Sequence, residues 1–327
     1  VYGPQQDNST ISLPSQATGP GISLQHWLSH GGCETGPVAV RPDNPNIVYS
    51  GCFGGRLARY DRSTEQFRQI RDYPQRQGGM PERELRYRFQ WNAPIVLSPH
   101  DPRVLYHGSQ YVHRSTNEGQ SWEVVSPDLT GNDQEKFGMA GGPITHDITG
   151  VEIYSALLAI EESPLEPGVI WTGSNDGKVH LSRDNGATWS DITPKDMSQP
   201  ATVNRIEPSP HSPAKAYLAV YRYRLDDFRP FIYRTTDYGL SWTLLTGGDN
   251  GIPEHHPIRV VREDPVRSGL LYAGTEFALF VSFDDGEHWQ SLQLNLPHTP
   301  VTDLKVHRDD LVVATQGRSF WILDDMT

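Results

Sequence analysis

Residues 282–289 read Ser-Phe-Asp-Asp-Gly-Glu-His-Trp, and the same spacing of Ser or Thr, Asp or Asn, Gly and Trp recurs three more times along the chain. The shared pattern is Ser/Thr-x-Asp/Asn-x-Gly-x-x-Trp. One chance match to four fixed positions is unremarkable, whereas four matches in one chain indicate an internal repeat. We call these segments the repeat motifs: Ser115–Trp122, Ser182–Trp189, Thr235–Trp242 and Ser282–Trp289.

A second pattern precedes each motif. A Pro-rich turn leads into an apolar stretch with an aromatic residue, as from Ser98-Pro-His-Asp-Pro102 to Tyr106. From this aromatic residue to the motif acid the offset is 11, 13 or 12 residues in three repeats, but it is 20 residues from Tyr217 to Asp237. The longer offset predicts an insertion within residues 221–229.

The same offset reveals two degenerate copies, at Asp61 and Asp325. Five full repeats therefore begin near residues 35, 86, 152, 202 and 257, with a half repeat at each end, around 1–30 and 301–327. Within the fifth repeat, alternating apolar residues and β-branched or aromatic side chains predict four short strands. These are Ile258–Arg262, Leu270–Gly274, Ala278–Ser282 and Trp289–Leu292.

Repeats of this length with four strands are typical of propeller blades. A superhelical stack of sheets is the alternative, but its shorter repeats do not occur here. The sequence thus predicts an all-β fold, a β-propeller of four-stranded antiparallel blades. About seven blades are expected, five complete and two partial, in one domain over residues 1–327.

Composition narrows the class of protein. Gly (30) and Pro (26) are plentiful, which suits short strands joined by tight turns. The net charge of −12 gives a nucleic-acid partner no electrostatic support and argues against docking on anionic membranes. No stretch approaches the ~20 apolar residues that span a bilayer. Val1 begins in mid-pattern without a charged leader, so we expect a processed or partial product of a longer chain.

We interpret the motifs as structural. Their Asp or Asn can accept hydrogen bonds from backbone N–H groups of its own turn, and their Gly can adopt positive φ. Trp can bury its ring between neighbouring hairpins. None of these roles requires a substrate.

The motif resembles the Asp-box, or BNR, repeat of sialidases, sortilin-type receptor ectodomains and two-propeller xyloglucan hydrolases. The whole chain resembles large bacterial proteins described as sortilin-like or glycosyl-hydrolase-like (WD40/YVTN/BNR-like), which are longer than this chain. The segments that carry this resemblance are Gly31–Gly36, Arg88–Trp91, Leu225–Pro230, Val261–Pro265, Val281–Asp285 and Gly317–Asp324.

By analogy with such propellers, ligands bind where the connections between second and third strands meet the segments leading into each blade. Paired carboxylates beside aromatic residues would suit glycoside hydrolysis there. The catalytic candidates are Asp226 and Asp227, which lie on the insertion, and Glu152. The ligand-binding candidates are Glu34, Arg88, Gln90, Trp91, Asn92, Asp176, Tyr221, Arg222, Glu276 and Arg318.

The resemblance implies a secreted or periplasmic binding propeller that recognises a peptide or glycan in a central funnel. A polysaccharide-active glycoside hydrolase using funnel carboxylates is the alternative. Binding is favoured because two hydrolase patterns are missing. No sialidase arginine triad can be assigned around Phe228-Arg229-Pro230, and Cys52 stands where the comparable xyloglucan hydrolase segment has its catalytic Asp.

No cofactor or metal is expected. Adjacent histidines on an extended strand point to opposite faces, so His255 and His256 are poor partners for one ion. There is no Gly-x-Ser-x-Gly elbow and no phosphate-binding loop.

Two cysteines, Cys33 and Cys52, lie almost symmetrically about the Pro42–Asn46 turn. They could face each other and form a disulfide in an oxidising compartment. Two buried free thiols are the equally weighted alternative.

Overall fold

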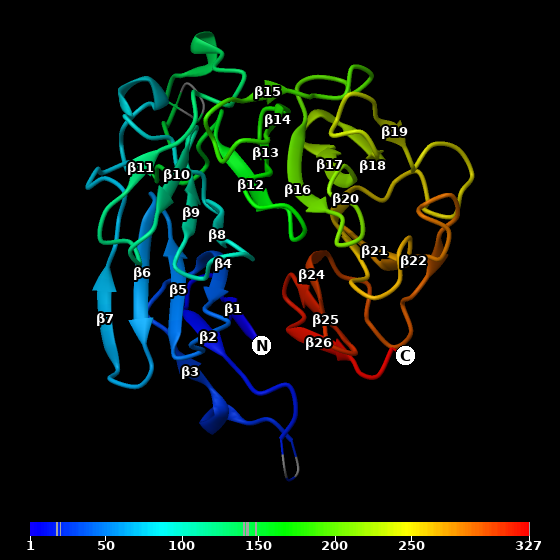
Figure 1. The fold of residues 1–327 in the computed structure, drawn as a ribbon, viewed down its shortest axis with the longest axis horizontal. Coiled ribbons are helices and arrows are strands. Elements are labelled where there is room, and N and C mark those ends of the chain that lie inside the picture. The colour runs from blue at the N-terminus through cyan, green and yellow to red at the C-terminus, as the bar shows by residue number, and fades with distance from the viewer. Residues whose placement is uncertain (18, 20, 140, 142–143, 148, 327) are drawn as a thin grey trace. The chain divides into compact units, whose positions relative to one another are not determined.

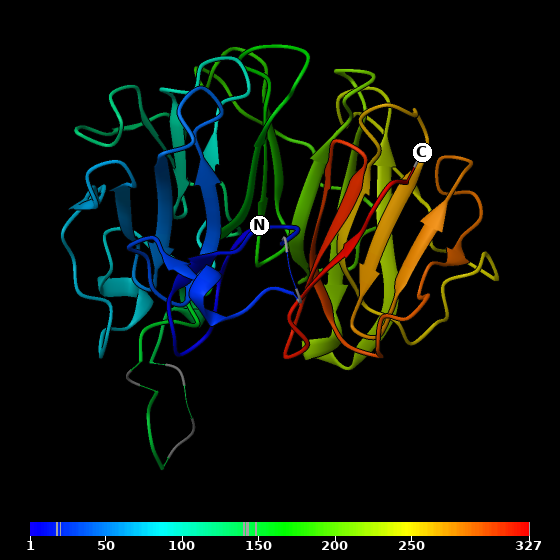
Figure 2. The same cartoon turned by 90° about the horizontal axis from the view of Figure 1, so that it is seen from below.

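The structure is a computed structural model that describes residues 1–17, 19, 21–139, 141, 144–147 and 149–326. The chain divides into two compact units, Val1–Ile160 with Gly186–Trp189, and Glu161–Asn185 with Ser190–Thr327. Each unit is built from small antiparallel sheets whose strands follow one another in sequence order (Figures 1 and 2). None of the helices in the described part of the chain has the length and apolarity to cross a bilayer.

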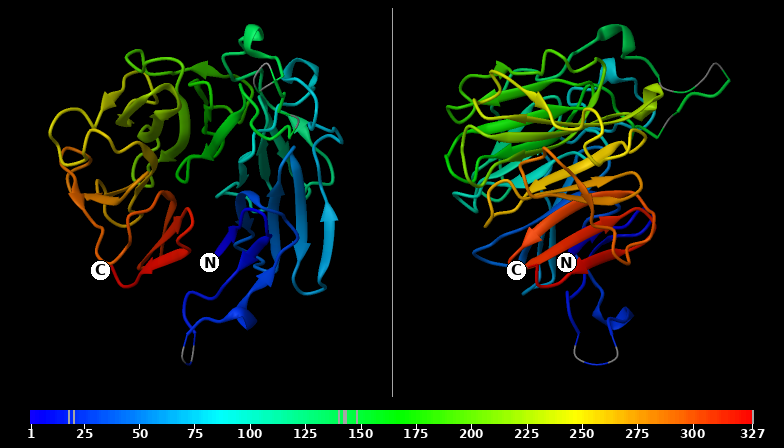
Figure 3. Two further views of the ribbon diagram at one scale, coloured as in Figure 1. Left: turned by 180° about the vertical axis from the view of Figure 1, so that it is seen from behind. Right: turned by 90° about the vertical axis from the view of Figure 1, so that its right-hand side faces the viewer.

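The first unit contains one three-stranded and two four-stranded sheets. They are β1 (Tyr2–Pro4), β2 (Thr10–Ser12) and β3 (Leu28–Ser29); β4 (Thr35–Val40), β5 (Ile47–Cys52), β6 (Arg56–Asp61) and β7 (Gln66–Gln69); and β8 (Ile95–Leu97), β9 (Leu105–Gly108), β10 (Val112–Ser115) and β11 (Glu123–Val124). Short 3-10 helices lie in the connections. These are η1 (Leu24–His26), on the connection coloured blue in Figure 3, η2 (Glu82–Glu84) and η3 (Gln134–Lys136).

A fourth sheet passes from the first unit to the second along its first strand. It consists of β12 (Leu157–Glu162), β13 (Ile170–Ser174), β14 (Val179–Ser182) and β15 (Ser190–Asp191). The second unit continues with β16 (Thr202–Pro208), β17 (Ala216–Arg222), η4 (Tyr223–Leu225), β18 (Asp227–Thr235) and β19 (Thr243–Leu244); then β20 (Ile258–Glu263), β21 (Leu271–Thr275), β22 (Leu279–Ser282) and β23 (Gln290–Ser291); and finally β24 (Val301–His307), β25 (Asp310–Thr315) and β26 (Phe320–Leu323).

These seven sheets are the blades of a β-propeller fold, so the predicted fold class is confirmed. The fifth repeat has its four strands within two residues of the predicted bounds. The half repeats at the two ends are each a three-stranded sheet. The predicted insertion is the long hairpin of β17 and β18, with η4 at its tip.

Burial follows a strand's place within its blade. Second strands such as β13 and β21 are buried along their whole length, which explains their continuous apolar runs. Fourth strands such as β7, β11 and β15 are exposed along theirs. The core therefore lies between the inner strands of adjacent sheets, as in the apolar cluster of Tyr217, Ile232, Val261 and Trp289.

Each repeat motif closes the turn between third and fourth strands. In the third motif Asp237 accepts the Ser241 N–H at 2.9 Å, and the Thr235 hydroxyl accepts the Gly239 N–H at 2.9 Å. Gly239 has a φ of +81°, a region that glycine enters without steric cost. The motif segments are thus turn structures, as the sequence predicts.

The motif tryptophans also contact residues near the preceding fourth strand. Three of the four motif tryptophans donate their indole N–H to a carbonyl just after the preceding fourth strand. Trp122 bonds to Ile70 at 2.8 Å and Trp242 to Ile192 at 2.7 Å. The third such pair is Trp189 with Val125, at 2.9 Å. In the fourth motif the Trp289 indole N–H is buried without a hydrogen-bond partner.

Three of the four motif glycines lie against these same residues, so a Cβ at Gly186 would approach the Val125 carbonyl oxygen to 2.7 Å. We expect Gly186→Ala to lower the free energy of unfolding by about 2–3 kcal/mol, because backbone strain and a backbone clash add. Gly248 is the matched control, with a φ of +79° and open space around it, and Gly248→Ala should cost about 1 kcal/mol. Urea unfolding of both variants measures the difference. Equal losses would show that Gly186 is needed only for its positive φ and not for its close contact with Val125.

Candidate functional site

Three first strands of the second unit, β16, β20 and β24, carry a β-bulge near their start. The pairing with the second strand shifts at Asn204 in β16, Arg259 in β20 and Thr302 in β24. A bulge re-aims the side chain of the extra residue and breaks regular pairing. The bulges therefore place polar side chains at the strand end where the second-to-third connections lie.

One bulge residue, Arg259, brings two connections together. Its Nη1 donates to the Tyr223 hydroxyl on the β17–β18 hairpin at 3.0 Å and to Glu276 Oε1 on the β21–β22 turn at 3.0 Å. Tyr221 stacks on Tyr223 with ring centroids 4.7 Å apart. We call these four residues the Tyr223 patch; it contains two of the predicted ligand-binding residues, Tyr221 and Glu276.

The Tyr223 patch holds an unsatisfied polar group, and exposed apolar side chains lie on the same connections. The Nε–H of Arg259 is buried without a hydrogen-bond partner. Leu225, Phe228 and Phe277, on the same two connections, are 50%, 44% and 46% exposed. Exposed aromatic rings can stack on sugar faces or pack against peptide side chains.

Asp226 and Asp227 lie at the tip of the same hairpin. Asp226 is exposed in a turn, with a φ of +59°. Asp227 lies within 2.5 Å of Arg222 and 2.9 Å of Arg229. The hydrogen bond from Arg229 lowers the pKa of Asp227 to about 2, against the effect of burial. Asp227 is therefore a carboxylate, which suits a base or nucleophile rather than an acid.

The other candidates of the second unit lie on neighbouring turns. Asp176, between β13 and β14, is buried and accepts a hydrogen bond from the Ser174 hydroxyl at 2.5 Å. Arg318, between β25 and β26, is exposed, and its carbonyl accepts the Trp321 indole N–H at 2.7 Å. Arg222 donates its Nε–H to the Pro200 carbonyl at 3.0 Å, which ties the hairpin to the segment before β16.

In the first unit, half-buried aromatic residues again meet an arginine. The Trp91 ring lies 6.4 Å from that of Phe53, and the Arg56 guanidinium stands 4.0 Å from the Phe53 centroid. Next to them the Asn92 side chain accepts the Gly36 N–H at 3.2 Å. We call Phe53, Arg56, Trp91 and Asn92 the Trp91 patch.

Arg88 and Gln90 on the same loop are buried. Arg88 donates to the Ser155 carbonyl at 2.9 Å and pairs with Asp128 at 2.8 Å. The Gln90 side chain accepts the Asn92 N–H at 2.8 Å. Both hold the loop in its observed conformation.

The first unit contains two further predicted site residues, both acidic. Glu34 accepts the Asp7 N–H at 2.7 Å. Glu152 is exposed and lines a shallow cleft with Glu82 and Asp147. Burial raises the pKa of Glu82.

A charged group on the first strands of the second unit was not predicted from the sequence. Arg262 pairs with Glu207 at 2.7 Å and with Asp303 at 2.9 Å, and Arg205 pairs with Asp303 at 3.2 Å. We call these residues, with Glu161, the first-strand cluster. The available signal was the polar residues placed at alternate positions of strands such as Arg205-Ile-Glu207, facing away from the blade interior.

The carboxyl groups of the first-strand cluster differ in acidity. Burial raises the pKa of Glu161 to about 7, and nearby Glu207 adds to this effect. Burial also opposes ionisation of Asp303, but Arg205 and Arg262 outweigh it and lower its pKa to about 2. Near neutral pH Asp303 is therefore ionised, whereas Glu161 is close to its titration midpoint.

Glu161 makes stability depend on pH. Its folded pKa lies above the usual 4.5, so its contribution to stability is present below pH 4.5 and is lost as pH rises through 7. The free energy of unfolding of Glu161→Gln, relative to that of wild type, should therefore rise by about 1–3 kcal/mol from pH 5 to pH 8. Urea unfolding of both proteins at the two pH values measures this. If the two proteins differ in stability by the same amount at pH 5 and pH 8, the raised pKa of Glu161 is contradicted.

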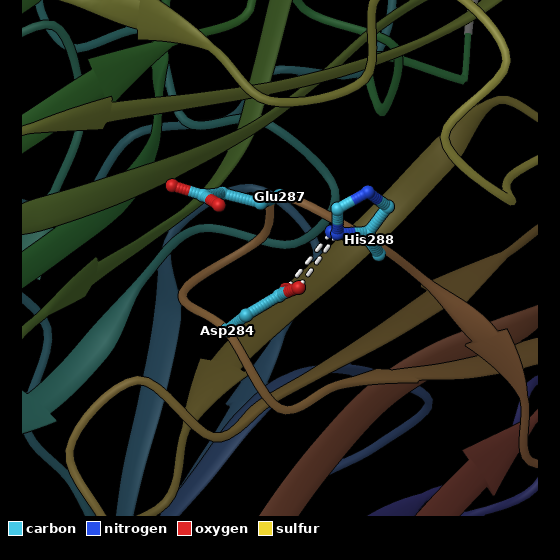
Figure 4. A group of neighbouring side chains, drawn as sticks. All are labelled: Asp284, Glu287 and His288. Atoms are coloured by element: carbon cyan, nitrogen blue, oxygen red, sulfur yellow. Dashed lines mark hydrogen bonds and ion pairs between the residues drawn. The ribbon is translucent and has the colours of Figure 1, made fainter.

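The fourth motif groups three possible metal ligands, Asp284, Glu287 and His288, whose ligand atoms lie within 4.8 Å of one another (Figure 4). All three are exposed. His288 Nδ1 lies 2.7 Å from Asp284 Oδ2, and Ser241 makes the corresponding contact with Asp237 at 2.6 Å in the third motif. The Asp–His contact therefore follows from the turn itself.

Comparison with protein-family models found no match, and neither did comparison with curated proteins. Solved structures share the fold. The GH74 xyloglucanase from Xanthomonas campestris is 16% identical with a TM-score of 0.68, over 99% of this chain and 50% of the enzyme. YCF48 bound to D1 peptide is 12% identical with a TM-score of 0.57, over 97% of this chain and 88% of that chain.

A third similar structure is the extracellular domain of a hybrid two-component system from B. thetaiotaomicron. It is 13% identical with a TM-score of 0.57, over 90% of this chain and 34% of that chain. The chain spans about half the length of the xyloglucanase and a third of this domain. At such identities the likeness establishes the β-propeller fold.

Proposed function

We propose that the chain is a secreted or periplasmic binding propeller that recognises a peptide or glycan at the ends of its blades. The Tyr223 patch carries this proposal. It combines a half-buried Tyr223, stacked on the buried Tyr221, with Arg259, and exposed apolar side chains lie on the same two connections. The Trp91 patch offers a similar chemistry in the first unit.

Other observations support parts of this proposal. The structural relatives include a propeller bound to a peptide and an enzyme named for a glycan substrate. The disulfide between Cys33 and Cys52 suits an oxidising compartment, and one relative is an extracellular domain. We further infer that the repeat motifs are Asp-box (BNR) repeats, that the chain is similar to the sortilin-like and glycosyl-hydrolase-like proteins, and that residues 1–327 act as one domain.

A paired glycan and peptide array tests the proposal. Wild-type protein should retain one class of ligand, and Arg259→Gln should weaken retention at least tenfold. Asp226→Ala/Asp227→Ala tests the hairpin tip in the same experiment. If wild-type protein retains nothing from either array, the proposed function fails; if the three proteins bind alike, the site assignment fails.

A glycoside hydrolase is the second candidate, because Arg262 of the first-strand cluster interacts both with Glu161, whose pKa is raised to about 7, and with Asp303, whose pKa is lowered to about 2. Such a contrast is what an acid and a base or nucleophile need. Reducing-sugar release from a panel of polysaccharides, with wild-type protein and Glu161→Gln, tests this role. Release that Glu161→Gln abolishes would favour the enzyme; absence of release, or release unchanged in the variant, would remove Glu161 as the acid.

A further inference from the structure

The loop between β7 and β8 carries Trp91 and Asn92 of the Trp91 patch, and it rests on a buried group of ionisable side chains. Asp72 comes from the start of this loop, His107 from β9 and His113 from β10. Their side chains are 1%, 1% and 2% exposed. Burying an ionisable group costs free energy unless hydrogen bonds or ion pairs compensate for the lost solvent.

The three side chains form one network. His107 Nδ1 lies 2.6 Å from Asp72 Oδ2, and His113 Nδ1 lies 3.9 Å from the same oxygen. On its other side, His113 Nε2 lies 2.8 Å from the Ser109 hydroxyl. The second Asp72 oxygen, Oδ1, is buried without a hydrogen-bond partner.

Two aromatic residues of the loop pack directly on the two histidines. The Phe89 ring stacks on His107 at 4.9 Å and on His113 at 5.7 Å, and Tyr87 meets His113 edge-on at 4.6 Å. The Gln77 side chain holds the backbone of Phe89 through both its N–H, at 3.1 Å, and its carbonyl, at 3.0 Å. Trp91 follows two residues later, so its position depends on this packing.

We propose that Asp72, His107 and His113 are positioning residues that latch the 70–94 loop in a pH-dependent manner, so that the Trp91 patch is assembled at neutral pH and released on acidification. This inference rests on the proposed binding function only for its consequence, the assembly of the Trp91 patch as a binding surface. The latch itself is a property of the free protein.

The direction of the pH effect follows from burial. The groups that face His113 are Asp72, His107, the Ser109 hydroxyl and Tyr87, whose ring also lies 5.2 Å from the Arg86 guanidinium. Burial lowers the pKa of His113 to about 4, and His107 adds to this while Asp72 opposes it. In an open loop the imidazole is solvated and takes up a proton near pH 6.5. The equilibrium ratio of open to closed loop should therefore rise roughly 20-fold from pH 7 to pH 5.

Hydrogen–deuterium exchange of the wild-type protein tests the latch without any ligand. After correction for intrinsic exchange rates, protection of residues 70–94 should fall roughly 20-fold from pH 7 to pH 5. Protection at the tip of the β17–β18 hairpin, residues 222–227, should fall less, because no histidine lies there. Unchanged protection of residues 70–94, or the same loss at residues 222–227, would overturn the proposal.

Two variants separate the latch from other buried histidines. His113→Asn cannot gain a proton, so its loop protection should vary less than threefold over the same pH range. His30 is the matched control, because burial also lowers its pKa to about 4, yet it lies outside the loop. His30→Asn should keep the wild-type pH response of residues 70–94, and a lost response would contradict the assignment. Loss of array binding with the exchange result intact would refute the binding function and leave the latch.

Discussion

Replacing Lys215 by Met is expected to lower the free energy of unfolding by about 3–5 kcal/mol, because it leaves the buried carboxylate of Glu263 without its cation. Lys215 Nζ lies 3.1 Å from Glu263 and 2.8 Å from Asp285. The Glu263 side chain is fully buried, and one of its oxygens already lacks a hydrogen-bond partner. Asp285 belongs to the fourth repeat motif, so this ion pair joins the motif to the preceding blade.

Urea unfolding of Lys215→Met measures the loss, and Lys178→Met is the matched control. Lys178 pairs with Asp191 at 3.1 Å, but both side chains are more than a third exposed, so its loss should cost at most about 1 kcal/mol. Lys215→Met/Glu263→Gln should recover part of the stability by removing the unpaired charge. Equal effects of the two lysine variants would contradict this assignment of the buried pair.

Removing the disulfide should have the second largest effect. Cys33 and Cys52 are bridged, with Cα atoms 5.0 Å apart and a sequence separation of 19. A loop of this length contributes about 3 kcal/mol by restricting the unfolded chain. Cys33→Ser/Cys52→Ser should therefore be less stable than oxidised wild type by about 3 kcal/mol.

Unfolding with and without reductant provides the control. Reduction should bring wild type close to the double variant and should leave the double variant unchanged. The backbone bond from the Cys33 N–H to the Gly51 carbonyl, at 3.0 Å, remains available in both. Wild-type stability that is indifferent to reductant would show that the bridge is absent or carries no stability.

Most of the fold was predictable because it repeats. Turn chemistry is local, so Asp237 and Gly239 mark the turn between third and fourth strands from their spacing alone. The docking of the motif glycines on Ile70, Val125, Ile192 and Leu245 was not predictable, since it joins neighbouring blades. The strand bounds were accurate where apolar alternation was regular, as in β20.

The candidate site was predictable only in part, for a physical reason. Loop position identified Tyr221 and Glu276, but Arg259 joins them through a bulge that no local pattern reveals. Arg88 and Asp176 fell in the predicted connections yet are buried, because burial depends on how distant segments pack. Ion pairs such as Arg262 with Asp303 join residues 41 positions apart and were invisible in the sequence.

The binding face is tested most directly by isothermal titration of the best array ligand into wild type, Tyr223→Ala and Tyr238→Ala. Tyr238 is the matched control, since it lies in the third repeat motif at the other end of β18, where its hydroxyl contacts Glu166 at 2.9 Å. We expect Tyr223→Ala to weaken binding at least tenfold and Tyr238→Ala to leave it within twofold of wild type. Binding that survives Tyr223→Ala but is lost in Tyr238→Ala would place the ligand on the motif turns and contradict the proposed site.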